Sequence, residues 1–407
     1  MADMTKEAEI LLHLIKKSFC PETEMLPDAL LREADWQKVM EEAMSQAVLI
    51  SAFDAAACYK SYMPQEVYLY WFQRVSKGMI ANLRVSRMQR ELTHLLEEHG
   101  FRHLILKGEA SAAFYSKPEL RHLGDIDFLI DPGQTDEIAA LLVGNGYVQS
   151  DHADVWHIGF RKAGVQLEMH FSIPGVPKGQ PGERICSHIQ NLLQETEIVT
   201  GLQGDFPAAK EIHHGLILLL HMQQHMISEG LGLRHLCDWA AFVNKTYQKD
   251  FWPLQLLPLL RELGLMKYTS VMTEICVRYL GISCPEWIGH DTELGDAVLH
   301  DILTGGNFGR KDMARSKAGV IIAQGGKMDP QQGTIHRFWT TLHQSTAQMY
   351  PAAQRSKSFH YLLDLYRIVL YMCRRALGKR PSLRKLTPLA QERSSIYAQL
   401  QIFETQQ

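Results

Sequence analysis

The sequence of 407 residues predicts an α+β fold in which a mixed sheet is flanked by N-terminal and C-terminal helical regions. Apolar residues recur at three- and four-residue intervals before residue 99 and again after residue 206, which is the spacing of one helix face. Between them, short alternating runs bounded by glycine and proline indicate strands and turns. A chain of this length exceeds one ordinary core. We therefore expect units at 1–99, 100–205 and 206–407.

The two outer regions are expected to be helical. Residues 36–59 keep an apolar stripe, with Asp35 placed to cap the first turn, and residues 65–98 repeat the pattern. The same period predicts C-terminal helices at 211–228, 233–247, 253–263, 267–280, 334–349, 358–377 and 389–403. Glycine-rich loops at 305–309 and 325–333 interrupt them; the first lacks the ending of a P-loop, and we interpret it as a flexible hinge.

The central region is expected to hold the sheet. Residues 101–106 and 125–130 are short apolar or alternating runs that end at turns, and a helix is expected at 135–145. Residues 155–161 and 165–173 should form paired strands around a turn at Ala163-Gly164. Strands mixed with helices over about 75 residues predict a compact α+β unit.

Composition indicates a soluble globular protein, with 46% apolar and 21% charged residues. The net charge of −3 gives the whole chain no attraction for nucleic acid, so we expect no nucleic-acid partner. Seven scattered cysteines without a C-x-x-C pair indicate reduced thiols. The N-terminus lacks the features of a signal peptide, and no apolar run approaches the ~20 residues that span a bilayer. We expect a cytoplasmic protein without a membrane partner.

The sharpest chemical feature is Gly124-Asp125-Ile126-Asp127 at the start of an apolar strand. Residues two apart on a strand point to the same side, so the two carboxylates lie together. Such a pair repels unless a cation lies between, and hard oxygen ligands suit Mg²⁺ or Mn²⁺. The alternative is two unrelated aspartates at a solvated strand edge.

A third acid follows in a later strand. Alternation over residues 166–170 places Gln166, Glu168 and His170 on one face. If this strand neighbours residues 125–130, Glu168 joins the two aspartates and completes the cluster that two-metal phosphoryl transfer requires. The alternative is an ordinary amphipathic surface strand.

Lys107-Gly108 ends the first apolar run, and a glycine there would let backbone N–H groups approach phosphate oxygens while the lysine adds charge. A plain strand-to-helix turn with a surface lysine explains the pair equally well.

Together, L-K-G at 106–108, R-x-x-G-D-I-D-F-L-I at 121–130 and E-x-H at 168–170 resemble the uncharacterised bacterial nucleotidyltransferase family of the polymerase-β superfamily. H-x-x-x-H at 221–225, followed by R-x-x-x-D-W at 234–239, is similar to the helical segment of that family. The resemblance covers most of the chain up to about residue 250. The Gly-Ser of the superfamily's phosphate turn appears here as Gly-Glu.

The resemblance implies a polymerase-β-type sheet and a metal-dependent enzyme that moves an NMP from an NTP, such as ATP, to a hydroxyl-bearing acceptor and releases pyrophosphate. The acceptor would be a small molecule, a sugar or a protein. Asp125 and Asp127 would bind both Mg²⁺ or Mn²⁺ ions, and Glu168 the catalytic one. The implied nucleotide-binding residues are Lys107, Gly108, Arg121 and Gly124, and the candidates for an acceptor pocket are His122, His170, His221 and Asp238.

Other interpretations stay open. A nucleotidyltransferase fold with a weak or inactive site would act as a regulatory or antitoxin-like binding module. His221 and His225 have zinc-ligand spacing, but no third ligand is evident, so a packing or pocket role is favoured. Arg234 and Asp238 are spaced for an ordinary helical ion pair, and the family likeness also makes them candidates for the pocket. The basic segment 374–385 is interpreted as a solvated helix end.

Overall fold

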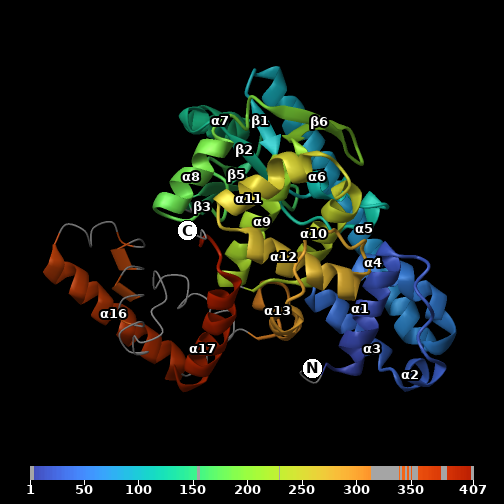
Figure 1. Ribbon diagram of the computed structural model, residues 1–407. Coiled ribbons are helices and arrows are strands. Elements are labelled where there is room, and N and C mark those ends of the chain that lie inside the picture. Colours follow the sequence, from blue (N-terminus) through green and yellow to red (C-terminus); the bar gives the residue numbers. More distant parts are fainter. Residues whose placement is uncertain are drawn as a thin grey trace.

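The computed structural model describes residues 4–153, 156–228, 230–312, 339, 342–343, 346–347, 350, 356–376 and 383–404. A seven-stranded mixed sheet, in the order β3-β4-β5-β2-β1-β7-β6, lies at its centre (Figure 1). The predicted α+β fold is therefore confirmed. The strands are β1 His103–Ile105, β2 Ile126–Ile130, β3 Val148–Ala153, β4 His157–Lys162, β5 Val165–His170, β6 Thr196–Thr200 and β7 Asp205–Ala209.

The middle of the sheet follows the expected pairing. β4 and β5 form an antiparallel hairpin whose turn, Ala163-Gly164, has positive φ at both residues. β5 lies parallel to β2 and β2 antiparallel to β1, so that Asp127 and Glu168 are direct register partners. β1 and β7 are parallel, although only a short stretch of them pairs.

Three strands were not expected from the sequence. β3 and β6 are the edges of the sheet and carry polar residues on most positions, so they lack a strong apolar alternation. β7 contains Pro207, which has no N–H to donate to a neighbouring strand and argues against an inner strand. β7 also carries the sheet to Ala209, beyond the expected end of the central region at residue 205.

Several expected helices are broken. The helix expected over 36–59 consists of α3 (Trp36–Ser45), α4 (Leu49–Ala56) and a short 3-10 turn, because the chain reverses at Ala47 with φ of 56°. The expected helix at 253–263 divides into a π-type turn, Trp252–Leu256, and α11 (Leu257–Glu262). The next one divides into α12 (Met266–Ile275) and a π-type turn, Cys276–Leu280.

The remaining helices are continuous. They are α1 Lys6–Phe19, α2 Asp28–Glu33, α5 Gln65–Glu98, α6 Glu109–Ala112, α7 Thr135–Gly144, α8 Gln180–Ile189, α9 Glu211–Ile227, α10 Leu233–Thr246, α13 Thr292–Gly305, α16 Lys357–Ala376 and α17 Leu383–Leu400, with 3-10 turns η2 Pro118–Leu120, η3 Pro132–Gln134 and η6 Asn307–Gly309.

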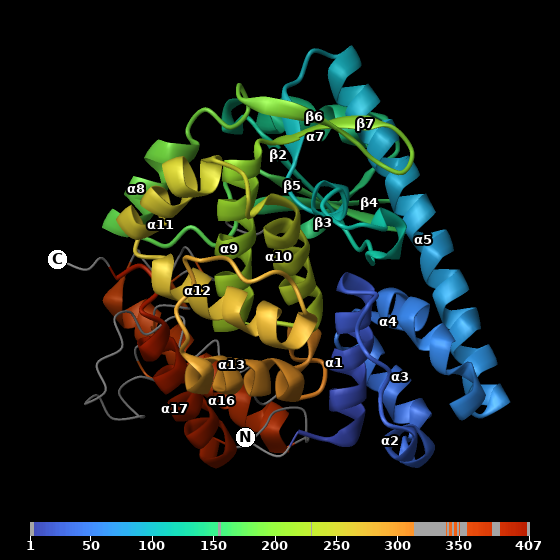
Figure 2. The ribbon, with the colours of Figure 1, turned by 45° about the vertical axis from the view of Figure 1, so that its right-hand side comes forward.

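Two hydrophobic cores hold these elements together. One joins α1, α3 and α4 with α9 to α13 and the end of α17, so helices from both ends of the chain share a single core. The other lies between the sheet, α7 and the C-terminal half of α5. Figure 2 shows the long helix α5 running past both the sheet and the N-terminal helices. The active-site candidates lie where the sheet meets the larger helical core.

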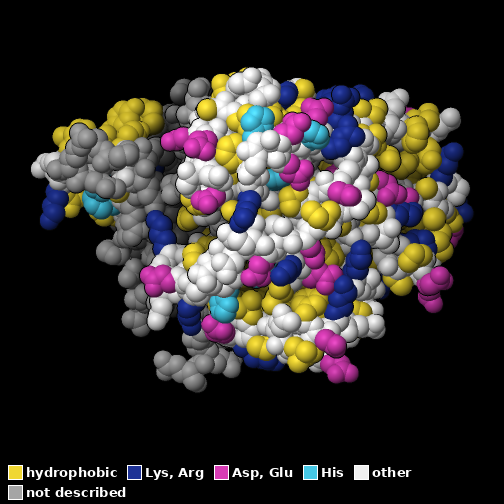
Figure 3. All heavy atoms as spheres, turned by 90° about the horizontal axis from the view of Figure 1, so that it is seen from above, with side chains coloured by type: hydrophobic (Ala, Val, Ile, Leu, Met, Phe, Trp, Pro, Cys, Tyr) yellow, Lys and Arg dark blue, Asp and Glu magenta, His cyan; other side chains and the backbone are white. Residues whose placement is uncertain are grey.

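Basic and acidic side chains alternate over the face shown in Figure 3, in keeping with the small net charge. Within the described ranges, no helix combines the length and apolarity that crossing a bilayer would require. All seven cysteines are free, as expected. The loop at 325–333, most of the helix expected at 334–349 and residues 377–382 of the basic segment lie outside the described residues.

Candidate active site

Three carboxylates from two neighbouring strands converge at the centre of the sheet. Asp125 precedes β2 by one residue, Asp127 lies within β2, and Glu168 lies opposite it on β5. One oxygen of each carboxylate lies within 4.8 Å of the others. The alternation of the sequence therefore brings together the three acids for the reason expected, namely that both strands present every second residue to the same face.

Asp127 is the most enclosed of the three acids, with its side chain 3% exposed. Its Oδ1 lies 3.1 Å from Lys107 Nζ and accepts a hydrogen bond from His170 Nε2 at 2.9 Å. Burial disfavours the charged form, but the lysine and the histidine outweigh it and hold the pKa of Asp127 well below its ordinary range. Asp127 is thus ionised and ready to bind a cation.

Asp125 and Glu168 complete the cluster in different surroundings. Repulsion from Asp127, with burial second, raises the pKa of Asp125. The Glu168 side chain is 32% exposed, and its Oε2 lies 3.3 Å from His170 Nε2. Burial opposes protonation of His170, but its hydrogen bonds to the two carboxylates raise its pKa overall. Lys107 and His170 are thus positively charged or protonatable groups in direct contact with the cluster.

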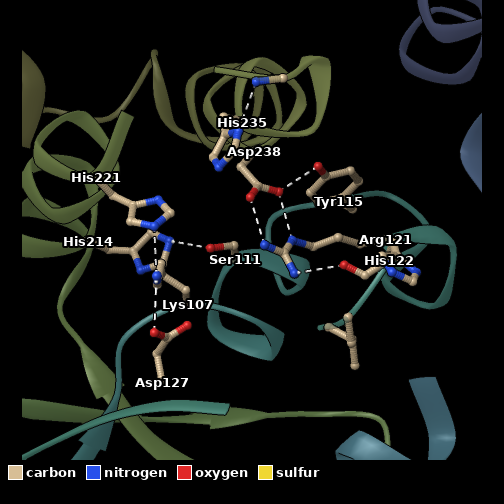
Figure 4. A network of polar contacts seen from close by, with 12 residues as sticks. Lys107, Ser111, Tyr115, Arg121, His122, Asp127, His214, His221, His235 and Asp238 are labelled. Atoms are coloured by element: carbon tan, nitrogen blue, oxygen red, sulfur yellow. Dashed lines mark hydrogen bonds and ion pairs between the residues drawn. The ribbon is translucent and has the colours of Figure 1, made fainter. Parts of the chain in front are cut away.

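The turn after β1 lies beside the acids. Gly108 has φ of 65°, a backbone conformation that favours glycine, and the turn delivers Lys107 between Asp127 and His221 (Figure 4). Glu109 follows Gly108 in the chain. Its side chain is buried away from the acids, where it accepts a hydrogen bond from Gln89 on α5 at 3.2 Å, and burial raises its pKa.

Arg121 is held in a buried ion pair. Its Nε and Nη2 each donate to a different oxygen of Asp238 on α10 at 2.7 Å, and Tyr115 donates to Oδ1 at the same distance (Figure 4). Asp238 therefore pairs with Arg121, and the alternative interpretation of a helical ion pair between Arg234 and Asp238 is not what the structure shows. The next residue, His122, does not line the cavity, and burial lowers its pKa to about 4.

The far wall is formed by α9, α10 and η6. His221 and His225 on α9 are joined by His235 on α10, a third histidine that spacing along one helix does not reveal. The ring of Phe308 lies 4.8 Å from that of His225 and 5.8 Å from that of His235. The 305–309 loop is therefore packed into the site, which contradicts its interpretation as a free hinge.

These groups enclose a cavity of about 290 Å³. All the predicted nucleotide-binding and metal-binding residues line this cavity, and so do three of the four candidates for the acceptor pocket. Trp156, His157, His235 and Phe308 were not predicted, because nothing in their local sequence marks them. The lining residues central to the site are Lys107, Gly108, Arg121, Gly124, Asp125, Asp127, Glu168, His170, His221, His225, Arg234, His235, Asp238 and Phe308.

Comparison with known proteins places the chain in a family context. The model of a family described as uncharacterised nucleotidyltransferase matches residues 32–281. That range contains the sheet, both helices of the far wall and all three carboxylates, and it ends before Phe308. No curated protein matches the chain.

Proposed function

The chain belongs to the uncharacterised nucleotidyltransferase family, and on this basis we propose that it transfers a nucleoside monophosphate from an NTP to a hydroxyl-bearing acceptor and releases pyrophosphate. The acceptor would be a small molecule, a sugar or a protein side chain. The observation that carries the proposal is the meeting of three carboxylates from β2 and β5 in a cavity that Lys107 also enters. We propose the cytoplasm as its location.

The carboxylates fit Mg²⁺ or Mn²⁺. They are hard oxygen donors, and the raised pKa of Asp125 marks negative charge that a divalent cation would relieve. In this proposal Asp125 and Asp127 hold both ions, and Glu168 holds the one beside the acceptor. Bound ions would offset the charge that develops on the reacting phosphate.

The other residues act on substrate and proton. Lys107 would turn its ammonium from Asp127 toward the phosphates, and the Gly108 turn leaves room for them. Glu168 is partly exposed and lines the cavity, and it would take the proton of the acceptor hydroxyl. His170 positions Asp127 through their hydrogen bond. Arg121 has a structural role in this proposal and does not bind phosphate, since its guanidinium is already paired with Asp238.

A transfer assay tests the proposal. The full chain is incubated with each NTP and Mg²⁺ or Mn²⁺ in cell extract, and nucleotidylated products are identified by mass spectrometry. Asp125→Ala and Asp127→Ala should lower the rate by at least about 10³-fold, because electrostatic stabilisation is the main catalytic device for phosphoryl transfer. Glu137→Ala, an exposed acid on α7, is the matched control and should keep full activity.

Activity retained by both aspartate variants would refute the proposed carboxylate roles. If the wild type bound NTP but turned none over with either metal, the enzyme proposal would fall, and the regulatory binding module would be favoured instead.

A further inference from the structure

We propose that the far wall of the cavity, formed by α9, α10 and η6, is the subsite for the pyrophosphate leaving group of the donor. This inference rests on the proposed function. Lys107 marks the boundary between the two walls, since its Nζ lies 3.1 Å from Asp127 Oδ1 and 2.7 Å from His221 Nε2 (Figure 4). The carboxylates of β2 and β5 lie on one side of this lysine, and His221 of α9 lies on the other.

Arg234 is the first donor of this wall. Its guanidinium lines the cavity, and among the described residues it forms no ion pair and no hydrogen bond; its Nε is buried without a partner. Burial, with the neighbouring Arg121 second, lowers the pKa of Arg234 more than Asp238 and Asp125 raise it. A partly buried cation of this kind, with a buried Nε, is costly unless an anion pairs with it. Arg234 therefore indicates that an anion binds here.

His235 supplies a second unpaired donor. The side chain is 2% exposed, and its Nδ1 accepts a hydrogen bond from the Gly232 backbone N–H at 3.3 Å. Burial keeps the ring neutral by lowering its pKa well below the ordinary value. A neutral ring that accepts at Nδ1 carries its proton on Nε2. This Nε2–H is buried, lines the cavity and has no hydrogen-bond partner among the described residues.

The tautomers of the other two histidines follow from Lys107. The lysine ammonium only donates, so His221 Nε2 accepts from it. His225 Nε2 lies 2.8 Å from the same atom and must then carry the proton between them. The His225 N–H thus points toward His221, whereas the His235 N–H has no acceptor among the described residues.

The cations beside the three histidines weigh against a zinc site. The three histidines offer ligand atoms within 4.8 Å of one another, and zinc is bound by three such groups in many enzymes. However, a metal ligand needs an unprotonated nitrogen. The cations Lys107 and Arg234 also lower the pKa of His225, to about 3 after the larger effect of burial, and the same positive field opposes a metal ion. The wall suits an anion.

Phe308 holds the two donors in place. Its ring lies 5.6 Å from the Arg234 guanidinium and packs edge-on against His235. Its φ of 57° is an uncommon conformation for a bulky residue. Close contacts with two glycines maintain it: a Cβ on Gly232 would lie 2.6 Å from Asn307 Cβ, and one on Gly230 3.1 Å from Gly309 N. Phe308 is a positioning residue, and it lies outside the range matched by the family model.

The wall fits the chemistry of the leaving group. The acceptor oxygen forms a bond to the α-phosphorus, and the bond from that phosphorus to the α,β-bridging oxygen breaks. The bond electrons stay with pyrophosphate, while the acceptor proton leaves through Glu168. Arg234 Nη1 lies near Gly124, beside the carboxylates, and Arg234 and His235 would receive the charge that pyrophosphate gains.

Inorganic pyrophosphate is the probe. We expect calorimetric titration of the full chain in chelator to show binding that Arg234→Met weakens at least tenfold, that Arg234→Lys weakens less, and that Arg261→Met leaves unchanged. Arg261 is exposed on α11 and does not line this cavity. Without pyrophosphate, Arg234→Met should melt at the wild-type temperature or above it, since it removes a partly buried cation that has no ion-pair partner among the described residues. It should lose the rise in Tm that pyrophosphate produces in the wild type.

A lowered Tm of Arg234→Met with unchanged pyrophosphate affinity would show a merely structural role and overturn the inference. So would one equivalent of zinc in chelator-free protein that is lost in His225→Ala. The Asp125→Asn/Asp127→Asn double variant separates the two proposals: it should not transfer nucleotide, yet it should still bind pyrophosphate. Binding by this variant with no transfer by the wild type would sink the proposed reaction and leave the anion subsite standing.

Discussion

The buried ion pair between Arg121 and Asp238 connects the sheet side of the site with α10, and breaking it from either side should be costly. Each side chain is about 5% exposed, and two charge-assisted hydrogen bonds of 2.7 Å join them. Removing one partner strands a buried charge, which costs about 3–5 kcal/mol in comparable pairs. We expect Asp238→Ala to lie at the upper end, because Tyr115 also loses its acceptor.

The double variant gives the sharper number. Replacing both groups in Arg121→Met/Asp238→Leu leaves no stranded charge, so its destabilisation should fall short of the sum of the single costs by about 3 kcal/mol. Urea unfolding followed by tryptophan fluorescence measures this, since buried Trp239 neighbours Asp238. A coupling energy below about 0.5 kcal/mol would refute the view that Asp238 neutralises Arg121 and would return Arg121 to the list of phosphate-binding residues.

Three further predictions follow from single contacts. Mg²⁺ should raise the Tm of the wild type but not that of Asp125→Asn. Without metal, Asp125→Asn should be more stable than the wild type, because repulsion from the neighbouring carboxylate is removed. Equal gains in Tm on adding Mg²⁺ would contradict metal binding. Gly175→Ala should cost roughly 3 kcal/mol or more, since its Cβ would lie 2.1 Å from the Leu220 carbonyl oxygen. Gly100→Ala, also at positive φ but with open space around it, should cost about 1 kcal/mol, and equal costs in denaturant unfolding would disprove the steric argument. Burial lowers the pKa of His103 to about 4, below its unfolded value. Up to roughly 3 kcal/mol of folding stability is therefore present above pH 6.5 and lost as the pH falls through about 4. The free energy of unfolding should depend less on pH in His103→Gln, and an unchanged slope would count against the assignment.

The acid cluster was predictable because it depends on local alternation and one pairing. Asp125 and Asp127 share a face by strand geometry, and Glu168 joins them once β5 lies beside β2. The edge strand β6 was not predictable in the same way, since its exposed Ile198 and polar neighbours carry no one-sided pattern. The reversal at Ala47 likewise leaves no signature, because no glycine marks its positive φ.

The nucleotide-binding assignments show where residue type is insufficient. The sequence motifs alone do not distinguish Arg121 from Arg234 as a phosphate ligand. In the folded chain Arg121 forms an ion pair with Asp238, while Arg234 forms no ion pair among the described residues. No sequence motif identifies His235 or Phe308, and they enter the site only because α10 and η6 pack against α9.

Periodicity and motif chemistry were enough to establish an α+β chain with a carboxylate cluster on its sheet, because both are encoded within a few neighbouring residues. Which cation is already paired, which histidine bears a proton toward the cavity and which loop closes the far wall depend on partners up to more than a hundred positions away. Those choices are made by packing between helices and sheet, where burial without a partner, and not residue type, determines what a side chain will bind.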